Sequence, residues 1–305
     1  MPREAFDGVQ YLGREKLLSF EEIALTARAF AELGVNKIRL TGGEPLLRRD
    51  LPALVELLAR IPGIDDIAMT TNASLLPRHA RALRAAGLDR LTVSLDTTNP
   101  EVFAAMTDSK YSVADVFAGI EAAEAAGFES IKINVVVQRG VNDHTLVETA
   151  EHFRGSPHIL RFIEFMDVGT ANDWALGQVV SGAEIVAMLA ERWPLEPTDP
   201  NYTGEVAKRY RYTDGGGEIG VITSVSRPFC GECSRVRLSA EGSIYTCLFA
   251  CGGTDLRSAI RGGATVDELR ARIAETWRNR RDRYSELRSR RTVPLRKVEM
   301  SFIGG

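Results

Sequence analysis

The feature that most constrains the fold is an alternation of helical apolar periods with short β-branched runs, repeated through the first half of the chain. In the first unit, Ser19 and Glu22 form a capping box, a helical period follows, Gly34 ends it, and Lys37–Thr41 is typical of a strand. Such alternation is typical of a parallel sheet covered by helices, so we predict an α/β fold. Further strands are predicted at 66–71, 90–96, 130–138 and 159–166, and helices at 20–33, 51–61, 77–86, 113–126 and 145–153.

None of these strands is followed by Gly-x-Gly-x-x-Gly, the turn with which doubly wound folds bind dinucleotides. Repeated βα units without that turn favour an open or complete barrel. After about residue 200 the alternation stops, and a Gly-rich, strand-like stretch, a cysteine segment, a helix at about 266–281 and a basic tail follow. We therefore predict two domains, a barrel over residues 1–200 and a C-terminal domain over residues 201–305.

Composition narrows the function. The chain has 305 residues and a net charge of -3, with no gross positive field, so nucleic acid is not predicted as a partner. The basic run at 278–291 is interpreted as a solvated helical face in preference to an RNA-binding segment. No apolar stretch reaches the roughly 18 residues of a membrane helix and the start has no signal-peptide core, so we expect a cytoplasmic protein without a membrane partner.

Polar side chains recur inside the predicted strands. Arg39 and Lys132 alternate with apolar residues that would face the helices, so period-2 parity points both cations into the barrel lumen or its mouth. Buried cations need a compensating anion. Two interpretations stay open: a bound polyphosphate, or structural ion pairs with internal carboxylates such as Asp96 and Glu164.

The loop that leaves the first predicted strand reads Gly42-Gly43-Glu44-Pro45. It lies at the carboxyl end of the strand, where barrels place their active sites, and its glycines permit close approach by a ligand. The alternative is a tight turn closed by Pro45 without a binding role.

All four cysteines lie in one short segment of the C-terminal half. Cys230 and Cys233 have the spacing of a two-thiolate grip, and a hairpin is expected to return Cys247 to their side. We predict a metal site with three thiolates, and zinc and an iron–sulfur cluster both stay open. Cys251 is either a fourth ligand or a buried bystander, and the latter is favoured. A disulfide is disfavoured because the cytosol keeps thiols reduced.

Two arginines lie between the cysteines of this segment. Arg235 and Arg237 fall on one side of a predicted strand, so both can face an anion that lies beside the metal.

Several motifs occur together in this chain: TGGEP at 41–45, TTN at 70–72, VSLD at 93–96, KINVVVQ at 132–138, RFIEFMDVG at 161–169, a C-x2-C-x13-C array and a terminal Gly-Gly. With them the chain resembles, over nearly its whole length, the GTP 3′,8-cyclases, which are radical S-adenosylmethionine (SAM) enzymes of molybdenum cofactor biosynthesis. The resemblance implies an incomplete (βα)6 TIM-type barrel with a C-terminal iron–sulfur extension. It implies two [4Fe–4S] clusters, a 5′-deoxyadenosyl radical from SAM that abstracts the ribose 3′ hydrogen, and conversion of GTP to 3′,8-cyclo-7,8-dihydro-GTP, the first step of molybdopterin biosynthesis.

The resemblance also assigns residues. SAM would contact Gly43, Ser94 and Met166. GTP would contact Arg39, Thr70, Lys132, Arg235 and Arg237. The C-terminal [4Fe–4S] cluster, whose open iron meets the guanine, would be held by Cys230, Cys233 and Cys247. The residues expected to assist the radical step are Arg235, Arg237, Gly304 and Gly305.

One part of the family pattern is missing from the sequence. The first cluster of the family is held by a C-x3-C-x2-C motif that ends just before a Met-Pro, and here the chain begins Met1-Pro2. Those cysteines and the first strand would precede residue 1. We therefore expect the chain as printed to be inactive as a cyclase and to bind about four irons rather than about eight.

The resemblance further implies a homodimer, an electron donor that the sequence does not identify, and a functional link to cyclic pyranopterin monophosphate synthase. Two alternatives are kept. A radical SAM enzyme with an auxiliary cluster that acts on a peptide would not need Arg39, Lys132, Arg235 and Arg237 around a triphosphate. A non-catalytic homologue would bind GTP or metal without turnover.

Overall fold

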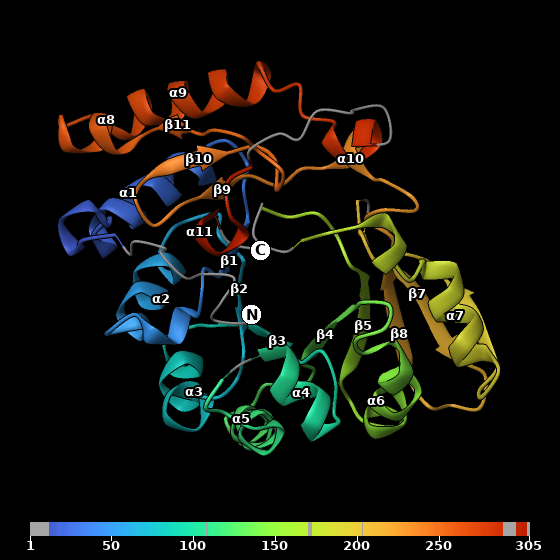
Figure 1. Ribbon diagram of the computed structural model, residues 1–305. Coiled ribbons are helices and arrows are strands. Elements are labelled where there is room, and N and C mark those ends of the chain that lie inside the picture. The colour runs from blue at the N-terminus through green and yellow to red at the C-terminus, as the bar shows by residue number, and fades with distance from the viewer. Residues whose placement is uncertain (1–11, 108, 170–172, 203, 289–296, 304–305) are drawn as a thin grey trace.

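The structure is a computed structural model that describes residues 12–107, 109–169, 173–202, 204–288 and 297–303. Its main sheet contains eight strands: β1 (Lys37–Leu40), β2 (Asp66–Thr71), β3 (Arg90–Ser94), β4 (Lys132–Val137), β5 (Ile159–Glu164), β6 (Leu195–Thr198), β7 (Lys208–Tyr212) and β8 (Glu218–Ile222). Their order is β1-β2-β3-β4-β5-β8-β7-β6. The pairs from β1 through β5 to β8 are parallel, whereas β7 and β6 add an antiparallel edge. The sheet curves as an open, partial TIM-type barrel (Figure 1).

Helices cover the convex side of this curve (Figure 1). They are α1 (Phe20–Ala31), α2 (Leu51–Ala59), α3 (Leu76–Ala85), α4 (Pro100–Thr107), α5 (Val113–Ala125), α6 (Leu146–Phe153) and α7 (Gly182–Ala190). The capping box predicted for α1 is confirmed, since the Ser19 side chain accepts from the Glu22 amide and Glu22 accepts from the Ser19 amide. Short 3₁₀ turns occur at Arg14–Lys16, Pro45–Leu47, Asp143–Thr145, Leu176–Gln178 and Cys230–Glu232. No helix in the described ranges is long and apolar enough to cross a bilayer.

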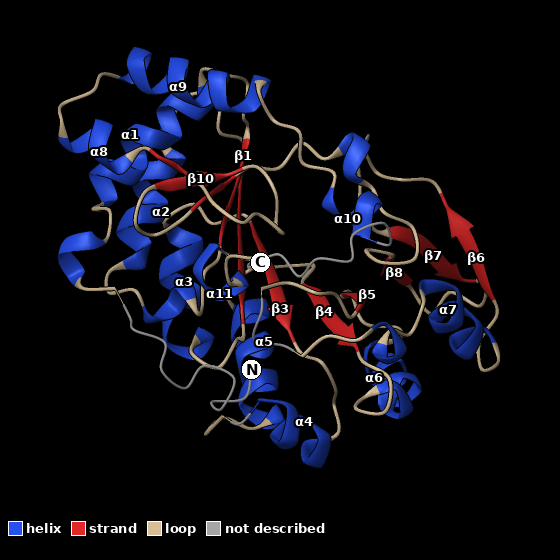
Figure 2. Cartoon of the chain, turned by 45° about the horizontal axis from the view of Figure 1, so that its top comes forward, coloured by secondary structure: helices blue, strands red, loops and turns tan. Residues whose placement is uncertain are grey.

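The described residues of the C-terminal part form a small antiparallel sheet and four helices. The strands are β9 (Arg237–Leu238), β10 (Ser243–Tyr245) and β11 (Thr254–Asp255), and the helices are α8 (Arg257–Arg261), α9 (Val266–Arg278), α10 (Tyr284–Leu287) and α11 (Met300–Ile303). Two views agree that α11 lies within the curve of the main sheet (Figures 1 and 2).

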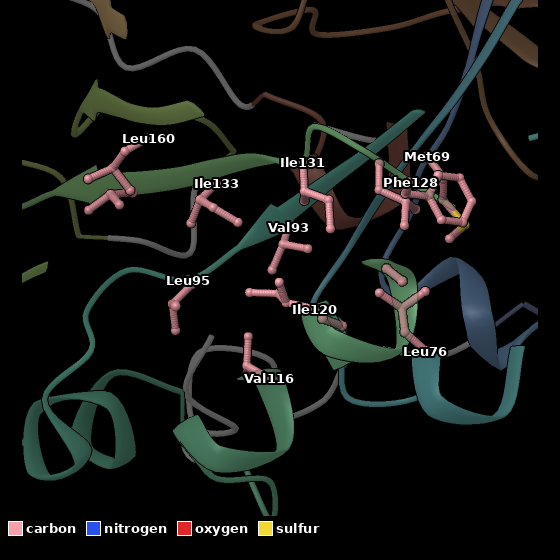
Figure 3. Close-up of a cluster of buried hydrophobic side chains, with 14 of the residues drawn as sticks. Met69, Leu76, Val93, Leu95, Val116, Ile120, Phe128, Ile131, Ile133 and Leu160 are labelled. Carbon is pink, nitrogen blue, oxygen red and sulfur yellow. The ribbon is translucent and has the colours of Figure 1, made fainter. Parts of the chain in front are cut away.

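The main core lies between the sheet and its helices. In Figure 3 the strand residues Val93 and Ile133 face Val116 and Ile120 of α5, and all four are at most 5% exposed. Burying each such side chain contributes about 1.5–3 kcal/mol. This packing fixes which side of each strand faces the helices, so the alternate residues must face the lumen.

A second core joins the beginning of the chain to its end. Ala29 of α1 and the preceding Leu18 are buried with Ile244, Leu256 and Leu269 from β10, the turn before α8, and α9. Two ion pairs close the same contact, Arg261 with Glu22 at 3.0 Å and Arg270 with Glu32 at 2.9 Å. The C-terminal part is thereby fixed beside the first helix.

The structure differs from the sequence prediction in three places. It contains α4 and α7, which were not predicted. Strand β8 pairs in parallel with β5 and so continues the barrel beyond residue 200, although the division at that residue stays a prediction. The single solvated helical face predicted for 278–291 is wrong in its described part: α9 ends at Arg278, α10 spans only Tyr284–Leu287, and the side chain of Arg288 is 10% exposed.

Candidate functional site

Cations gather on the lumen side of the parallel strands, as parity predicted. Arg39 on β1 donates from Nη1 to the Oγ1 of Thr70 on β2 and to the Oγ1 of Thr92 on β3, both at 3.0 Å. Thr70 and Thr92 are register partners in adjacent strands. Hydroxyls on two neighbouring strands thereby aim the guanidinium, which is partly desolvated by the protein around it.

Two further cations lie across the lumen on β4 and β5. Lys132 is half-buried, and Arg161 donates from Nε to the Oδ1 of Asn134, its register partner, at 3.0 Å. Arg161 was not predicted as a site residue, because its parity differs from that of Glu164. A usable signal was Gly220, which faces Arg161 on β8: a Cβ there would lie 3.1 Å from the Cγ of Arg161, so the glycine leaves room for the long side chain.

The positive charges of these residues repel one another, and this repulsion and burial lower their pKa values. Burial, followed by the charges of Arg161 and Arg90, lowers the pKa of Lys132 to about 8. Burial and the charge of Arg39 lower the pKa of Arg161 to about 10, and burial and Arg90 lower the pKa of Arg39. The lowered pKa values mean that the charged forms of these side chains are destabilised by burial and by one another. A bound anion would stabilise the charged forms.

The described residues do not show the alternative of structural ion pairs for this group. Within the described ranges no ion pair within 4.0 Å involves Arg39, Lys132 or Arg161. Asp96 instead accepts from the Val136 amide at 2.8 Å. The buried carboxylate of Glu164 accepts from three backbone amides, those of Gly182, Val225 and Ser226, at 2.6–2.8 Å.

The amino ends of the strands offer a contrast. There Asp66 forms ion pairs with Lys37, at 3.1 Å, and with Arg90. The lumen cations Arg39, Lys132 and Arg161 have no such partner in the described structure, which leaves them available to a polyanionic ligand.

The Gly-Gly loop is held open beside this group. Glu44 accepts from the Thr71 hydroxyl and the Asn72 amide, both at 2.8 Å, and so fixes the loop to the end of β2. Gly42 has a φ of 143°, which favours glycine, and a Cβ built on Gly43 would meet nothing within 4 Å. Exposed Ser94 at the end of β3 and half-buried Met166 just beyond β5 also lie at the carboxyl ends of strands.

The cysteine segment forms the predicted hairpin. Strands β9 and β10 pair in antiparallel, with Arg237 opposite Tyr245. Cys230, Cys233 and Cys247 are half-buried, whereas Cys251 is exposed, so the prediction of a buried bystander is wrong in its burial. In the described ranges no group of three His, Cys, Asp or Glu side chains is close enough to hold a metal ion.

The chemistry of the three half-buried thiols nevertheless fits an iron–sulfur cluster. The Sγ of Cys247 accepts from the Phe249 amide and the Sγ of Cys233 from the Nη2 of Arg235, both at 3.4 Å, as cluster sulfurs commonly do. Burial alone would raise the pKa of Cys233, but the charge and hydrogen bonds of Arg235 lower it overall. Burial raises the pKa of Cys247.

The two arginines of this segment face the thiols. Arg235 lies over the ring of Phe229, 5.2 Å from its centroid. Burial and the charge of Arg235 lower the pKa of Arg237, while the neighbouring sulfurs of Cys233 and Cys247 oppose that shift. Gly304 and Gly305 lie outside the described residues.

Comparison with known proteins places this fold in a class. Residues 4–153 match the radical SAM superfamily, and residues 158–286 match the family described as Molybdenum Cofactor Synthesis C. Solved structures resemble the chain in part: the FeFe-hydrogenase maturase HydG of Carboxydothermus hydrogenoformans is 21% identical over 57% of this chain and 43% of its own, with a TM-score of 0.46. The parallel partial barrel and the family match define a radical SAM enzyme.

Relatives of known name are much closer in sequence. The chain is 51% identical to the GTP 3′,8-cyclase of Acidothermus cellulolyticus over all of this chain and 91% of the relative. It is 52% identical to that of Xanthomonas axonopodis over 95% of this chain and 86% of the relative, and 43% identical to that of Staphylococcus aureus over 100% and 91%. The chain belongs to the GTP 3′,8-cyclase family. Membership implies SAM and a [4Fe–4S] cluster as cofactors.

Proposed function

We propose that this chain binds GTP in the barrel lumen and acts in its conversion to 3′,8-cyclo-7,8-dihydro-GTP, the first step of molybdopterin biosynthesis. The observation that carries the proposal is the group of lumen cations, Arg39, Lys132 and Arg161, which face a shared space without an ion-pair partner in the described structure. A triphosphate supplies the charge and the many acceptor oxygens that such a group lacks.

Each assigned residue has a physical task. Arg39, aimed by Thr70 and Thr92, and Lys132 would hold the phosphates and fix the ribose at the mouth of the barrel. Arg235 and Arg237 would contact the nucleotide at its guanine end, beside the metal. At the carboxyl ends of the strands, SAM would contact Gly43, Ser94 and Met166.

The cofactors supply the radical chemistry that this chain's side chains cannot. Cys230, Cys233 and Cys247 would hold the C-terminal [4Fe–4S] cluster, with amide and guanidinium hydrogen bonds to their sulfurs. Because thiols held by turns close on a metal only when it binds, we expect the ligand group to form as the cluster assembles. Gly304 and Gly305 would assist at the nucleotide, next to α11.

The remaining assignments rest on the family. We propose a cytoplasmic protein that forms a homodimer and supplies the substrate of cyclic pyranopterin monophosphate synthase, with residues 1–200 as the SAM-binding barrel and 201–305 as the cluster- and GTP-binding part.

Equilibrium binding tests the proposal most directly. Anaerobically reconstituted protein is titrated with GTP, GDP and GMP, and separately with ATP. Affinity is expected to fall with each phosphate removed, because the lumen cations contact the phosphates, and ATP is expected to bind more weakly than GTP, because the cluster end reads the base. Equal affinity for GTP and GMP would overturn the assignment of the lumen.

A further inference from the structure

A buried ionic network joins the end of β5 to the last part of the described chain. Its centre is Asp167, just beyond β5, whose Oδ2 accepts from the hydroxyl of Tyr284 and the Nζ of Lys297, both at 2.6 Å. Its Oδ1 lies 2.7 Å from the Nη2 of Arg288. The Asp167, Arg288 and Lys297 side chains are only 11%, 10% and 7% exposed. We call these four residues the Asp167 clamp.

Aromatic rings enclose the clamp and connect it to the cysteine segment. Phe249 stacks on Tyr284 with ring centroids 4.9 Å apart, and Arg288 and Lys297 lie 5.1 and 5.5 Å from the Phe249 ring. The amide of Phe249 donates to the Sγ of Cys247. The wall of the clamp is therefore part of the loop that carries a cluster ligand.

Further contacts connect the clamp to the last described residues of the chain. The amide of Val298 donates to the carbonyl of Ala250 at 2.9 Å, and the Nζ of Lys297 also donates to the carbonyl of Asp167 at 2.6 Å. Glu299 packs against Gly169, where a Cβ would lie 2.1 Å from its Oε2. Directly after these contacts comes α11, which lies within the curve of the sheet in both views (Figures 1 and 2).

The position of residues 297–303 depends largely on one carboxylate, that of Asp167. Two buried cations meet there, and without the anion they would repel each other in a place that water hardly reaches. α11 is a single helical turn and is too short to be stable on its own. Its place must therefore come from the contacts that precede it.

We propose that Asp167 is a positioning residue that clamps the segment 297–303 to the end of β5 and couples the seating of α11 to the loop of Cys247. When the thiolate of Cys247 binds a metal, the backbone of Phe249 and Ala250 becomes less mobile. Through its contacts with the clamp, this backbone then also restricts the motion of the C-terminal segment. The proposal goes beyond the binding of GTP, and the seating of the segment can be measured without nucleotide.

Amide hydrogen exchange of the whole chain tests the clamp. In Asp167→Asn the exchange of residues 298–303 is expected to rise at least about tenfold, since a buried cation pair loses its anion, while the peptides of β1–β4 keep their protection. Lys297→Met is the second variant, for use if the first does not fold. Asp214→Asn is the matched control, because Asp214 also pairs with an arginine, Arg154, but at the far edge of the sheet.

A double-mutant cycle separates positioning from general stability. The effects of Asp167→Asn and Lys297→Met on this exchange are expected to be non-additive, because the two side chains contact each other. Unchanged exchange at 298–303 in both single variants, or a uniform rise across the whole sheet, would overturn the clamp.

The coupling has its own readout. Reconstitution with iron and sulfide is expected to slow the exchange of residues 298–303 in the native sequence and to leave it fast in Asp167→Asn. Equal exchange before and after reconstitution of the native protein would refute the coupling. Neither outcome depends on whether GTP is the substrate, which the nucleotide titration decides.

Discussion

The barrel lumen and the cysteine segment solve the same problem, the placement of charged or reactive side chains, in opposite ways. In the lumen, Arg39 is aimed by hydroxyls on two neighbouring strands and Arg161 by an amide on a third, all within one hydrogen-bonded sheet. The cysteines lie in turns around a two-residue strand, and their sulfurs have few partners. A sheet fixes a ligand site before the ligand arrives, whereas a site built from turns is completed by the metal it binds.

The largest effect should appear in the cysteine segment. Cys247→Ser, with one thiolate of three lost, is expected to lose the iron that the C-terminal cluster holds in the reconstituted native chain. Cys251→Ser is the matched control, because this exposed thiol is not an assigned ligand, and it should retain the iron. Iron analysis and the visible absorption of the cluster measure both, and iron lost from the Cys251 variant instead would make that thiol a ligand.

The lumen should be sensitive to charge and insensitive to metal. Arg39→Met is expected to weaken GTP binding about 100-fold, since removing one member of a desolvated charge contact costs about 2–5 kcal/mol. Calorimetric titration with GTP measures the loss. Arg211→Met on β7, whose arginine pairs with Glu196 away from the lumen, should bind normally. If both variants bind alike, the lumen does not hold the phosphates.

A pH titration sharpens the same comparison, because the lumen contains a lysine with a pKa of about 8. Below this pKa Lys132 is charged and attracts phosphate. Above it the side chain is neutral, so the dissociation constant of GTP should rise by up to about tenfold per pH unit until the pKa of the bound form is reached. Phosphate is fully ionised in this range and adds no slope of its own.

Lys132→Arg provides the control for that titration. Arginine stays protonated, so the slope above pH 8 should disappear while binding persists. A slope of the same size in this variant would assign the titration to another group.

The smallest expected effect comes from the hydroxyls that aim Arg39. Thr70→Val removes one of the two acceptors but leaves the Thr92 hydroxyl, so GTP should bind only a fewfold more weakly, in line with a hydrogen bond worth about 1 kcal/mol. Thr198→Val, at the antiparallel edge, is the control. A loss as large as that of Arg39→Met would mean that the arginine depends on a single neighbour.

Parity within strands predicted the lumen well because burial on one face leaves each side chain only two directions. It placed Arg39 and Lys132 correctly, but it missed Arg161, whose place follows from register with Asn134 and Gly220 on other strands. The loop was harder, because no periodicity governs a turn. The spacing of the cysteines indicated that the thiols lie near one another. It did not indicate whether their sulfurs come close enough to bind one metal centre.

Long-range ionic contacts lay beyond the reach of local patterns. Arg288 appeared as one of many basic residues in a solvated run, whereas it is buried against Asp167 from a distant part of the chain. Nothing near either residue indicates the other. Likewise β8 looked like part of a separate domain, because one α-helix and two strands separate it from its parallel partner β5.

The second core, which α1 shares with α8 and α9, can form only after the C-terminal part has been synthesised. The ribosome makes α1 long before its partners Ile244, Leu256 and Leu269. At about 5–20 residues per second, the apolar side of α1 waits on the order of ten seconds or more without its cover. During translation the apolar side of α1 therefore stays uncovered until the C-terminal part has been made.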